Sequence, residues 1–176
     1  GIMKILNSND KNFDRILDSL LIKRKRKING NSVTVTSIIK DVKKNGDKAL
    51  LKYEKKFNKN SIIIPTTKKI HNSIKTLDKK IKKAIDLAYN RIYKFHSLQK
   101  FKNISYIDNF KNKLEYKYLP IDSVAIYVPG STVSYPSSVL MNAIPAIVAG
   151  VKRIVMINPG SKGKLNSAVL YAARKC

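Results

Sequence analysis

The sequence predicts an α/β fold in which a helical amino-terminal region is followed by the start of a parallel β-sheet. Two nearly continuous apolar runs, residues 124–128 and 154–157, flank a segment of small and apolar residues that ends at Gly150. Strands covered on both faces have such runs, and a helix between two of them is typical of a parallel β-α-β unit. Before Pro120, apolar residues recur at intervals of three and four, which is typical of amphipathic helices.

Five helices are expected in the amino-terminal part of the chain. They cover residues 10–24, 33–44, 47–57, a short segment that starts at Thr66 or Thr67, and residues 78–99. The basic run 23–27 interrupts the apolar pattern and is expected to end the first helix. Gly46 separates the second helix from the third, because glycine commonly ends a helix in the left-handed conformation.

Extended segments are expected between and after these helices. The apolar residues 62–64 predict a short buried strand, and alternation over residues 104–118 predicts a hairpin-like segment. Pro120 separates this Lys-rich part from the part punctuated by Gly, Pro and Ser. We therefore expect three regions: a helical arm over residues 1–30, a helix-rich first-domain segment over residues 31–120, and the start of a second domain over residues 121–176.

The parallel unit itself is expected to have a right-handed crossover. Ser137 or Ser138 is expected to cap the connecting helix, and Pro145 is expected to kink or restart it. A further helix is expected over residues 165–175. The loop at residues 129–136 then lies at the carboxyl end of the first strand, which is the edge where open parallel sheets bind ligands.

The formal net charge of +25 does not require a nucleic-acid surface. Thirty of the 36 basic residues are Lys, and Asn and Ile are also abundant. All three have A/T-rich codons, so a biased genome composition is sufficient to produce this charge. The run 23–27 lacks interleaved aromatic residues. We expect no specific nucleic-acid partner, although non-specific contact with polyanions at low salt is favoured.

Other features of the composition exclude several classes of protein. The single cysteine, Cys176, excludes an internal disulfide framework and is typical of a reducing compartment. No apolar stretch approaches the roughly 18 residues of a membrane span. The first residues carry no long apolar signal region. We expect a cytoplasmic protein with no membrane partner.

The chemistry of single residues gives few candidate sites. The loop at residues 129–136 has neither the G-x-G-x-x-G dinucleotide fingerprint nor a Gly-Lys-Ser/Thr phosphate loop. Tyr127, at the end of the first strand, is either a core aromatic, which its chemistry alone slightly favours, or a flat wall for a ring-shaped ligand. His71, His96 and Cys176 are far apart in sequence, so no metal site is expected within this chain.

Three segments carry a family resemblance. Residues 127–156 read YVPGSTVSYPSSVLMNAIPAIVAGVKRIVM, a long and contiguous segment. Upstream, residues 42–57 read VKKNGDKALLKYEKKF and residues 91–99 read RIYKFHSLQ. In order and spacing, these segments closely resemble the histidinol dehydrogenase family.

The resemblance implies an incomplete Rossmann-like fold of the aldehyde-dehydrogenase-like superfamily, in which the usual glycine fingerprint is missing. It implies oxidation of L-histidinol to L-histidine, the last step of histidine synthesis, with two NAD molecules that each take up a hydride in turn. It also implies a zinc ion that holds the substrate, a Glu-His pair that acts as bases, and a homodimer.

Four positions of this chain correspond to site residues of the family. Tyr127 matches a tyrosine that contacts NAD, and Pro129 and Gly130 match the adjoining loop. Ser137 matches a serine near the reacting end of the cofactor. The resemblance therefore predicts a cofactor-facing wall at residues 127–137.

The chain also departs from the family pattern. Ser131 stands where the family usually has a second glycine, and NAD binding is expected to weaken if that glycine needs positive φ or close approach. Ile147 replaces a usually polar residue and is expected to be neutral. Nothing in residues 1–176 matches the zinc ligands or the Glu-His pair. We therefore expect an inactive amino-terminal fragment that has no catalytic or metal-binding residue.

Two other functions stay open. A related zinc- and NAD-dependent alcohol dehydrogenase for another small substrate would share these segments. A stand-alone basic module for nucleic acid or a partner subunit would instead bind with a steep dependence on salt.

Overall fold

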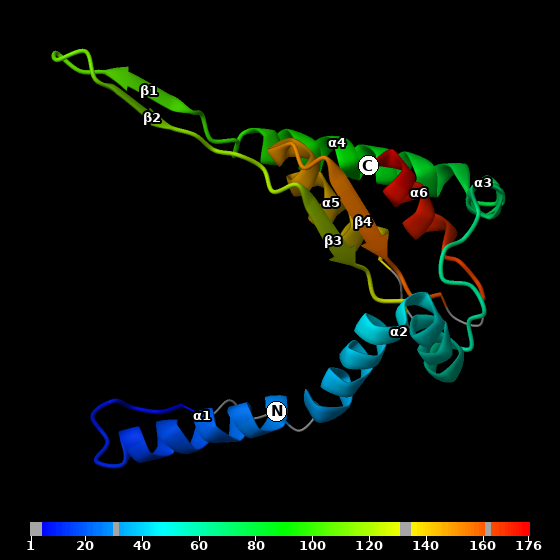
Figure 1. Ribbon diagram of the computed structural model, residues 1–176, viewed down its shortest axis with the longest axis horizontal. Coiled ribbons are helices and arrows are strands. Elements are labelled where there is room, and N and C mark those ends of the chain that lie inside the picture. The colour runs from blue at the N-terminus through cyan, green and yellow to red at the C-terminus, as the bar shows by residue number, and fades with distance from the viewer. Residues whose placement is uncertain (1–4, 30–31, 131–134, 161–162) are drawn as a thin grey trace. The chain divides into compact units, whose positions relative to one another are not determined.

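The computed structural model describes residues 5–29, 32–130, 135–160 and 163–176 of a mixed α/β chain (Figure 1). The chain divides into two units, Gly1–Lys52 and Tyr53–Cys176. Among the described residues, no helix combines the length and the apolar character needed to cross a membrane.

The first unit is helical. Helix α1 (Phe13–Asn29) continues through the basic run 23–27, so the prediction that this run ends the helix is wrong. Lysine and arginine are good helix formers, and the loss of an apolar pattern does not by itself stop a helix. Helix α2 (Ser32–Asn58) begins in this unit and breaks at Gly46, where φ is 55° and ψ is −139°, which confirms the predicted separation of two helices.

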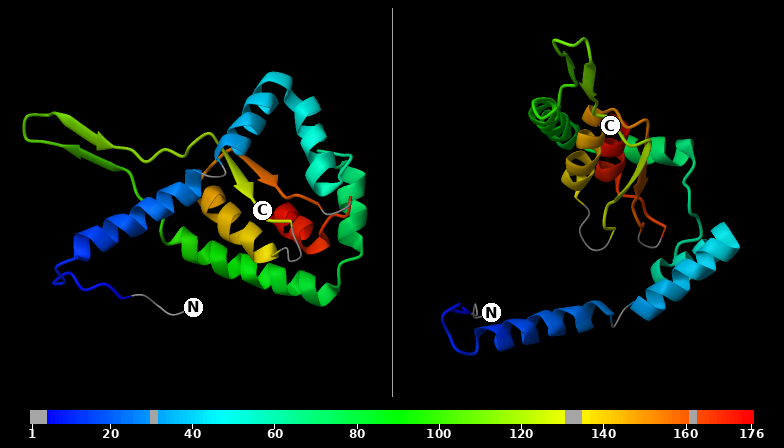
Figure 2. Two further views of the ribbon diagram at one scale, coloured as in Figure 1. Left: turned by 90° about the horizontal axis from the view of Figure 1, so that it is seen from below. Right: turned by 60° about the vertical axis from the view of Figure 1, so that its left-hand side comes forward.

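The second unit contains four more helices and four strands in its described part (Figure 2). They are α3 (Thr67–Lys75), α4 (Lys79–Ser97), β1 (Ile104–Ile107), β2 (Lys113–Tyr116), β3 (Ser123–Tyr127), α5 (Pro136–Ala149), β4 (Arg153–Ile157) and α6 (Ser167–Lys175). The helices predicted at 66–67 and 78–99 and the predicted hairpin are confirmed. The strand predicted at 62–64 is wrong, because Ile62 and Ile64 lie in a connection and are 51% and 80% exposed.

Polar side chains begin three of these helices, but not α5. Thr66, Asp78 and Asn166 accept hydrogen bonds from backbone N–H groups at the starts of α3, α4 and α6. Helix α5 instead begins at Pro136, whose fixed φ suits the first helical position, so neither Ser137 nor Ser138 is the N-cap.

The interior of α5 also differs from expectation. Pro145 lies within the helix, which continues to Ala149; of the predicted kink or restart, the restart is therefore wrong. Gly150 then ends α5 in the left-handed conformation, with φ 88° and ψ 22°.

Strands β3 and β4 form a parallel pair in which Tyr127 lies opposite Ile157. Helix α5 contacts both strands and also packs against α4 and α6 (Figure 2). The core consists of apolar side chains from α4, β3 and the residue after it, α5 and α6: Ile85, Ile126, Val128, Val139, Leu140, Ala143, Ile144, Val169 and Ala172.

Only one face of the β3–β4 pair is covered within the described residues. Burial alternates along both strands, and Tyr127, Val155 and Ile157 are 61%, 38% and 49% exposed. The prediction of strands covered on both faces is therefore wrong for this chain. The helices that cover the pair contact the face that carries Ile126, Ile154 and Met156.

Replacing Ile144 by alanine should destabilise the second unit by about 2–5 kcal/mol, because its side chain is fully buried and its removal leaves a cavity. Met141→Ala on the same helix is the matched control, since Met141 is 62% exposed and its loss should cost less than about 0.5 kcal/mol. Urea unfolding of both variants measures the difference, and equal costs would contradict this assignment of the core.

Acidification should loosen the turn between β1 and β2. Hydrogen bonds from the side-chain amide and backbone N–H of Asn112, and from the backbone N–H of Phe110, hold the pKa of the Asp108 carboxyl below its usual value. A lowered folded-state pKa means that the stabilisation is complete above the unfolded-state pKa and is lost as the pH falls through the folded-state pKa. Between about pH 5 and about pH 2, the Phe110 and Asn112 amide resonances should titrate in the natural chain and stay constant in Asp108→Asn.

Candidate functional site

The parallel register brings the ends of β3 and β4 to one edge of the sheet. Tyr127 and Ile157 are paired, so the segments that follow them leave the sheet side by side. The Val128 N–H donates to the Ile157 carbonyl oxygen at 2.8 Å and extends the pairing by one residue. We call residues 127–130 and 157–160 the strand-end site.

Tyr127 lies on the bare face of the sheet. Side chains alternate along a strand, so Tyr127 points away from the helices because its neighbour Ile126 points toward them. Its 61% exposure rules out the first of the two alternatives, a core aromatic. The ring is instead accessible beside Ile157, where a flat ligand could lie against it.

A close backbone approach locks the two segments of the strand-end site together. A Cβ atom added at Gly130 would lie 1.5 Å from the carbonyl oxygen of Pro159, so no side chain fits at this position. The side-chain amide of Asn158 donates to the Val128 carbonyl oxygen at 2.9 Å. Gly130 is therefore required by its contact with the neighbouring segment.

The other residues predicted from the resemblance are less closely gathered. Pro129 is exposed next to Gly130, and Ser137 is exposed in the first turn of α5. Ser131 lies outside the described residues. Ile147 is half-buried on α5, where it lines the cavity described next.

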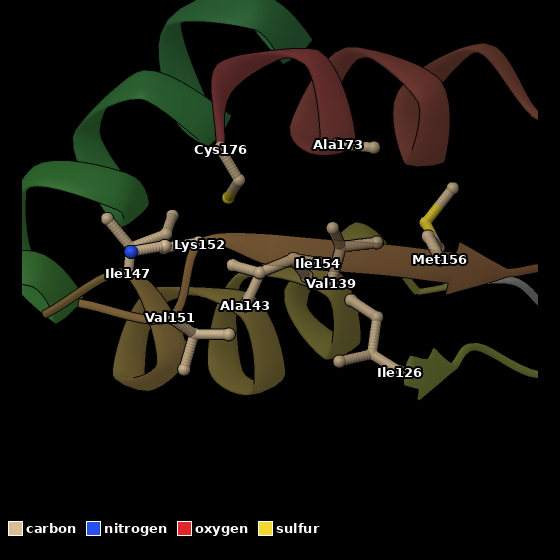
Figure 3. Close-up of a pocket in the computed structure, with 10 residues that line it drawn as sticks. All are labelled: Ile126, Val139, Ala143, Ile147, Val151, Lys152, Ile154, Met156, Ala173 and Cys176. Atoms are coloured by element: carbon tan, nitrogen blue, oxygen red, sulfur yellow. The ribbon is translucent and has the colours of Figure 1, made fainter. Parts of the chain in front are cut away.

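A cavity of about 450 Å³ lies on the helix-covered face of the sheet (Figure 3). Its lining comes from β3, α5, β4, α6 and the residues that follow α5 and α6: Ile126, Val139, Ala143, Ile147, Val151, Lys152, Ile154, Met156, Ala173 and Cys176. Burial raises the pKa of the Cys176 thiol, which favours its neutral form. Tyr127 does not line this cavity, so the cavity is separate from the exposed aromatic surface of the strand-end site.

The two histidines are not part of the strand-end site. His71 is exposed on α3, and His96 pairs through Nδ1 with the Gln99 side-chain oxygen at 2.7 Å at the end of α4. Within the described ranges, no three His, Cys, Asp or Glu side chains come together in a way that could hold a metal ion.

Sequence reasoning missed one buried residue near this edge. Asn60 is 6% exposed and hydrogen-bonds to the carbonyl oxygen of Gly160 and the N–H of Gly163. Its local signal is weak: it is a second asparagine just beyond the end of a helix. The partners are about one hundred positions away, so no local pattern identifies them.

Comparison with known proteins decides the family. A family model described as histidinol dehydrogenase matches residues 22–176. The chain belongs to the histidinol dehydrogenase family. This confirms the resemblance seen in the three segments of the sequence.

Individual members of the histidinol dehydrogenase family support this assignment. The histidinol dehydrogenase of Pelagibacter ubique (strain HTCC1062) is 75% identical over 175 residues, which are 99% of this chain and 41% of that protein. That of Acinetobacter baylyi is 41% identical over 177 residues, with 98% and 41% coverage. The chain thus spans about two fifths of the length of these relatives.

A solved structure gives the same result for the fold. The crystal structure of histidinol dehydrogenase from Elizabethkingia anophelis superposes with a TM-score of 0.77 at 32% identity, over 82% of this chain and 34% of that one. The mixed α/β architecture is therefore shared with the histidinol dehydrogenase family. The alternatives of another alcohol dehydrogenase and of a stand-alone basic module gain no support from these comparisons.

Gly130→Ala should disrupt the strand-end site, because the new methyl group would collide with the Pro159 backbone. We expect a loss of about 1–3 kcal/mol in the free energy of unfolding and displaced amide resonances for Asn158 and Val128. Ser137→Ala, at an exposed position, should change neither. An unaltered Asn158 resonance in Gly130→Ala would contradict the close approach.

Proposed function

We propose that this chain forms the NAD-facing part of a histidinol dehydrogenase, an enzyme that oxidises L-histidinol to L-histidine in histidine synthesis. Membership of the family supports the reaction class. The observation that carries the assignment to these residues is the exposed Tyr127 ring beside the tight crossing of Gly130 and Pro159. In this proposal the chain adopts an incomplete Rossmann-like fold of the aldehyde-dehydrogenase-like superfamily.

The position of the strand-end site supports the proposal that it binds NAD. It lies at the carboxyl edge of parallel strands, where open α/β sheets bind nucleotides. Tyr127 offers a flat aromatic surface to a ligand, and the contact of Gly130 with Pro159 fixes the backbone beside it. When bound, NAD supplies the acceptor for a hydride from the substrate. Tyr127 would then flank a ring of NAD and shield one side of it from water, while Pro129 and Gly130 would bound its position.

Zinc does not fit the described residues of this chain. The described segments contain no group of three or more potential ligands within reach of one another. We propose that the zinc ligands and the Glu-His bases belong to residues outside this sequence, in line with its 41% coverage of the relatives. By this proposal the 176-residue chain does not oxidise histidinol by itself, and the working enzyme is a cytoplasmic homodimer.

Tyr127→Ala should weaken NAD binding about tenfold, because a stacked ring contributes roughly 1–3 kcal/mol. Tyr106→Ala on the β1–β2 hairpin is the matched control, since Tyr106 is 58% exposed and Tyr127 is 61% exposed. Isothermal titration with NAD measures both variants, and Tyr106→Ala should bind as the natural chain does. Equal affinities for the two variants, or no NAD binding by the natural chain, would overturn the assignment.

Two assays test the reaction itself. The purified 176-residue chain with NAD, L-histidinol and zinc should produce no NADH. A zinc-dependent NADH signal would contradict the proposal that the zinc ligands and the bases lie outside this sequence. The product of the complete gene, assayed with L-histidinol and with simple primary alcohols, should prefer L-histidinol.

A further inference from the structure

Asn60 is the buried polar side chain in the part of the chain that the structure describes, at 6% exposure. Its Nδ2 donates to Glu54 Oε2 at 2.9 Å and to the Gly160 carbonyl oxygen at 2.8 Å. Its Oδ1 accepts from the Gly163 N–H at 2.9 Å. Both donor hydrogens and the acceptor oxygen are used, and the partners fix which atom is nitrogen, because Glu54 Oε2 and the Gly160 oxygen only accept.

The backbone adopts an unfavourable conformation at Lys59, directly before Asn60. Helix α2 ends at Asn58, and Lys59 follows in the left-handed region with φ 56°. This conformation costs an L-residue with a side chain free energy, so it persists only where the surroundings hold it. The Asn60 N–H returns to the Glu54 carbonyl oxygen at 3.3 Å, and the side chain is thereby aimed at residues 160 and 163.

The contacts of Asn60 lead directly to the strand-end site. Gly160 follows Pro159, whose carbonyl oxygen occupies the space that a Gly130 side chain would need. The side-chain amide of Asn158, the residue before Pro159, donates a hydrogen bond to the Val128 carbonyl oxygen. A displacement of Gly160 would therefore move the backbone against which Gly130 rests, and with it the segment that follows Tyr127.

We propose that Asn60 is a positioning residue for the dinucleotide site. It latches the end of α2 to Gly160 and Gly163 and so sets the spacing between the segments that follow β3 and β4. This role rests on the proposed function, because the strand-end site is taken as the NAD site. Asn60 itself does not contact the cofactor in this proposal.

The chain offers a matched pair of variants. Asn58 and Asn60 each donate from Nδ2 to one oxygen of the same glutamate, Glu54, at 2.9 Å. Only Asn60 is also bonded to Gly160 and Gly163. Asn60→Asp and Asn58→Asp therefore both set a carboxylate beside Glu54, but only Asn60→Asp turns an acceptor toward the Gly160 carbonyl oxygen.

At pH 7.5, Asn60→Asp should raise the Kd for NAD about tenfold and shift the Gly130 amide resonance, whereas Asn58→Asp should leave both nearly unchanged. Thermal unfolding checks that each variant is folded at the assay temperature, so that the Kd reports the native site. Equal Kd values for the two variants at pH 7.5 would overturn the positioning role.

A measurement on the natural chain keeps the proposal testable if Asn60→Asp does not fold. Coupling between two sites is reciprocal, so saturating NAD should slow hydrogen exchange of the Gly163 amide, which donates to Asn60. The Gly150 amide, bonded to Ile147 at the end of α5, should not change. NAD binding without slower exchange at Gly163 would overturn the latch and leave the proposed function standing, whereas a natural chain that binds no NAD would overturn both.

Discussion

The parallel register of β3 and β4 is the constraint on which the candidate site depends. Five residue pairs, from Ser123 with Arg153 to Tyr127 with Ile157, bring the two strand ends to one edge. A slip of one residue would turn Tyr127 toward the helices and separate Gly130 from Pro159. The fully buried side chains of Val128, Ile144 and Val169 resist such a slip. The packing of the core therefore determines the geometry of the site.

The elements that sequence reasoning found are those with a local signal. Apolar runs gave both strands of the parallel pair, helical spacing gave α4, and Gly46 gave the break in α2. The position of Tyr127 was not predictable in this way, because an apolar run does not tell whether a second layer covers the strand. The start of α5 was missed since Pro136 determines it and the two serines do not. Asn60 was missed because its partners are distant in sequence.

The candidate site combines a packed core with an exposed aromatic side chain. The core beneath β3 and β4 fixes the backbone, while the side chain most suited to a ligand, Tyr127, projects from the uncovered face. Exposed groups on a rigid scaffold are where binding functions commonly reside. The chain covers about two fifths of its relatives, and the described residues provide scaffold and an aromatic surface but no cluster for a metal.

The bare face of the β3–β4 pair and the net charge of +25 have opposite effects on self-association of the chain. Exposed apolar strands are prone to stack or pair with other copies, and mutual repulsion between strongly cationic molecules opposes this. The repulsion reaches about 30 Å in 0.01 M salt but only about 10 Å in 0.1 M salt. Added salt therefore favours self-association of this chain, and buffers of low ionic strength keep it dissolved as separate molecules.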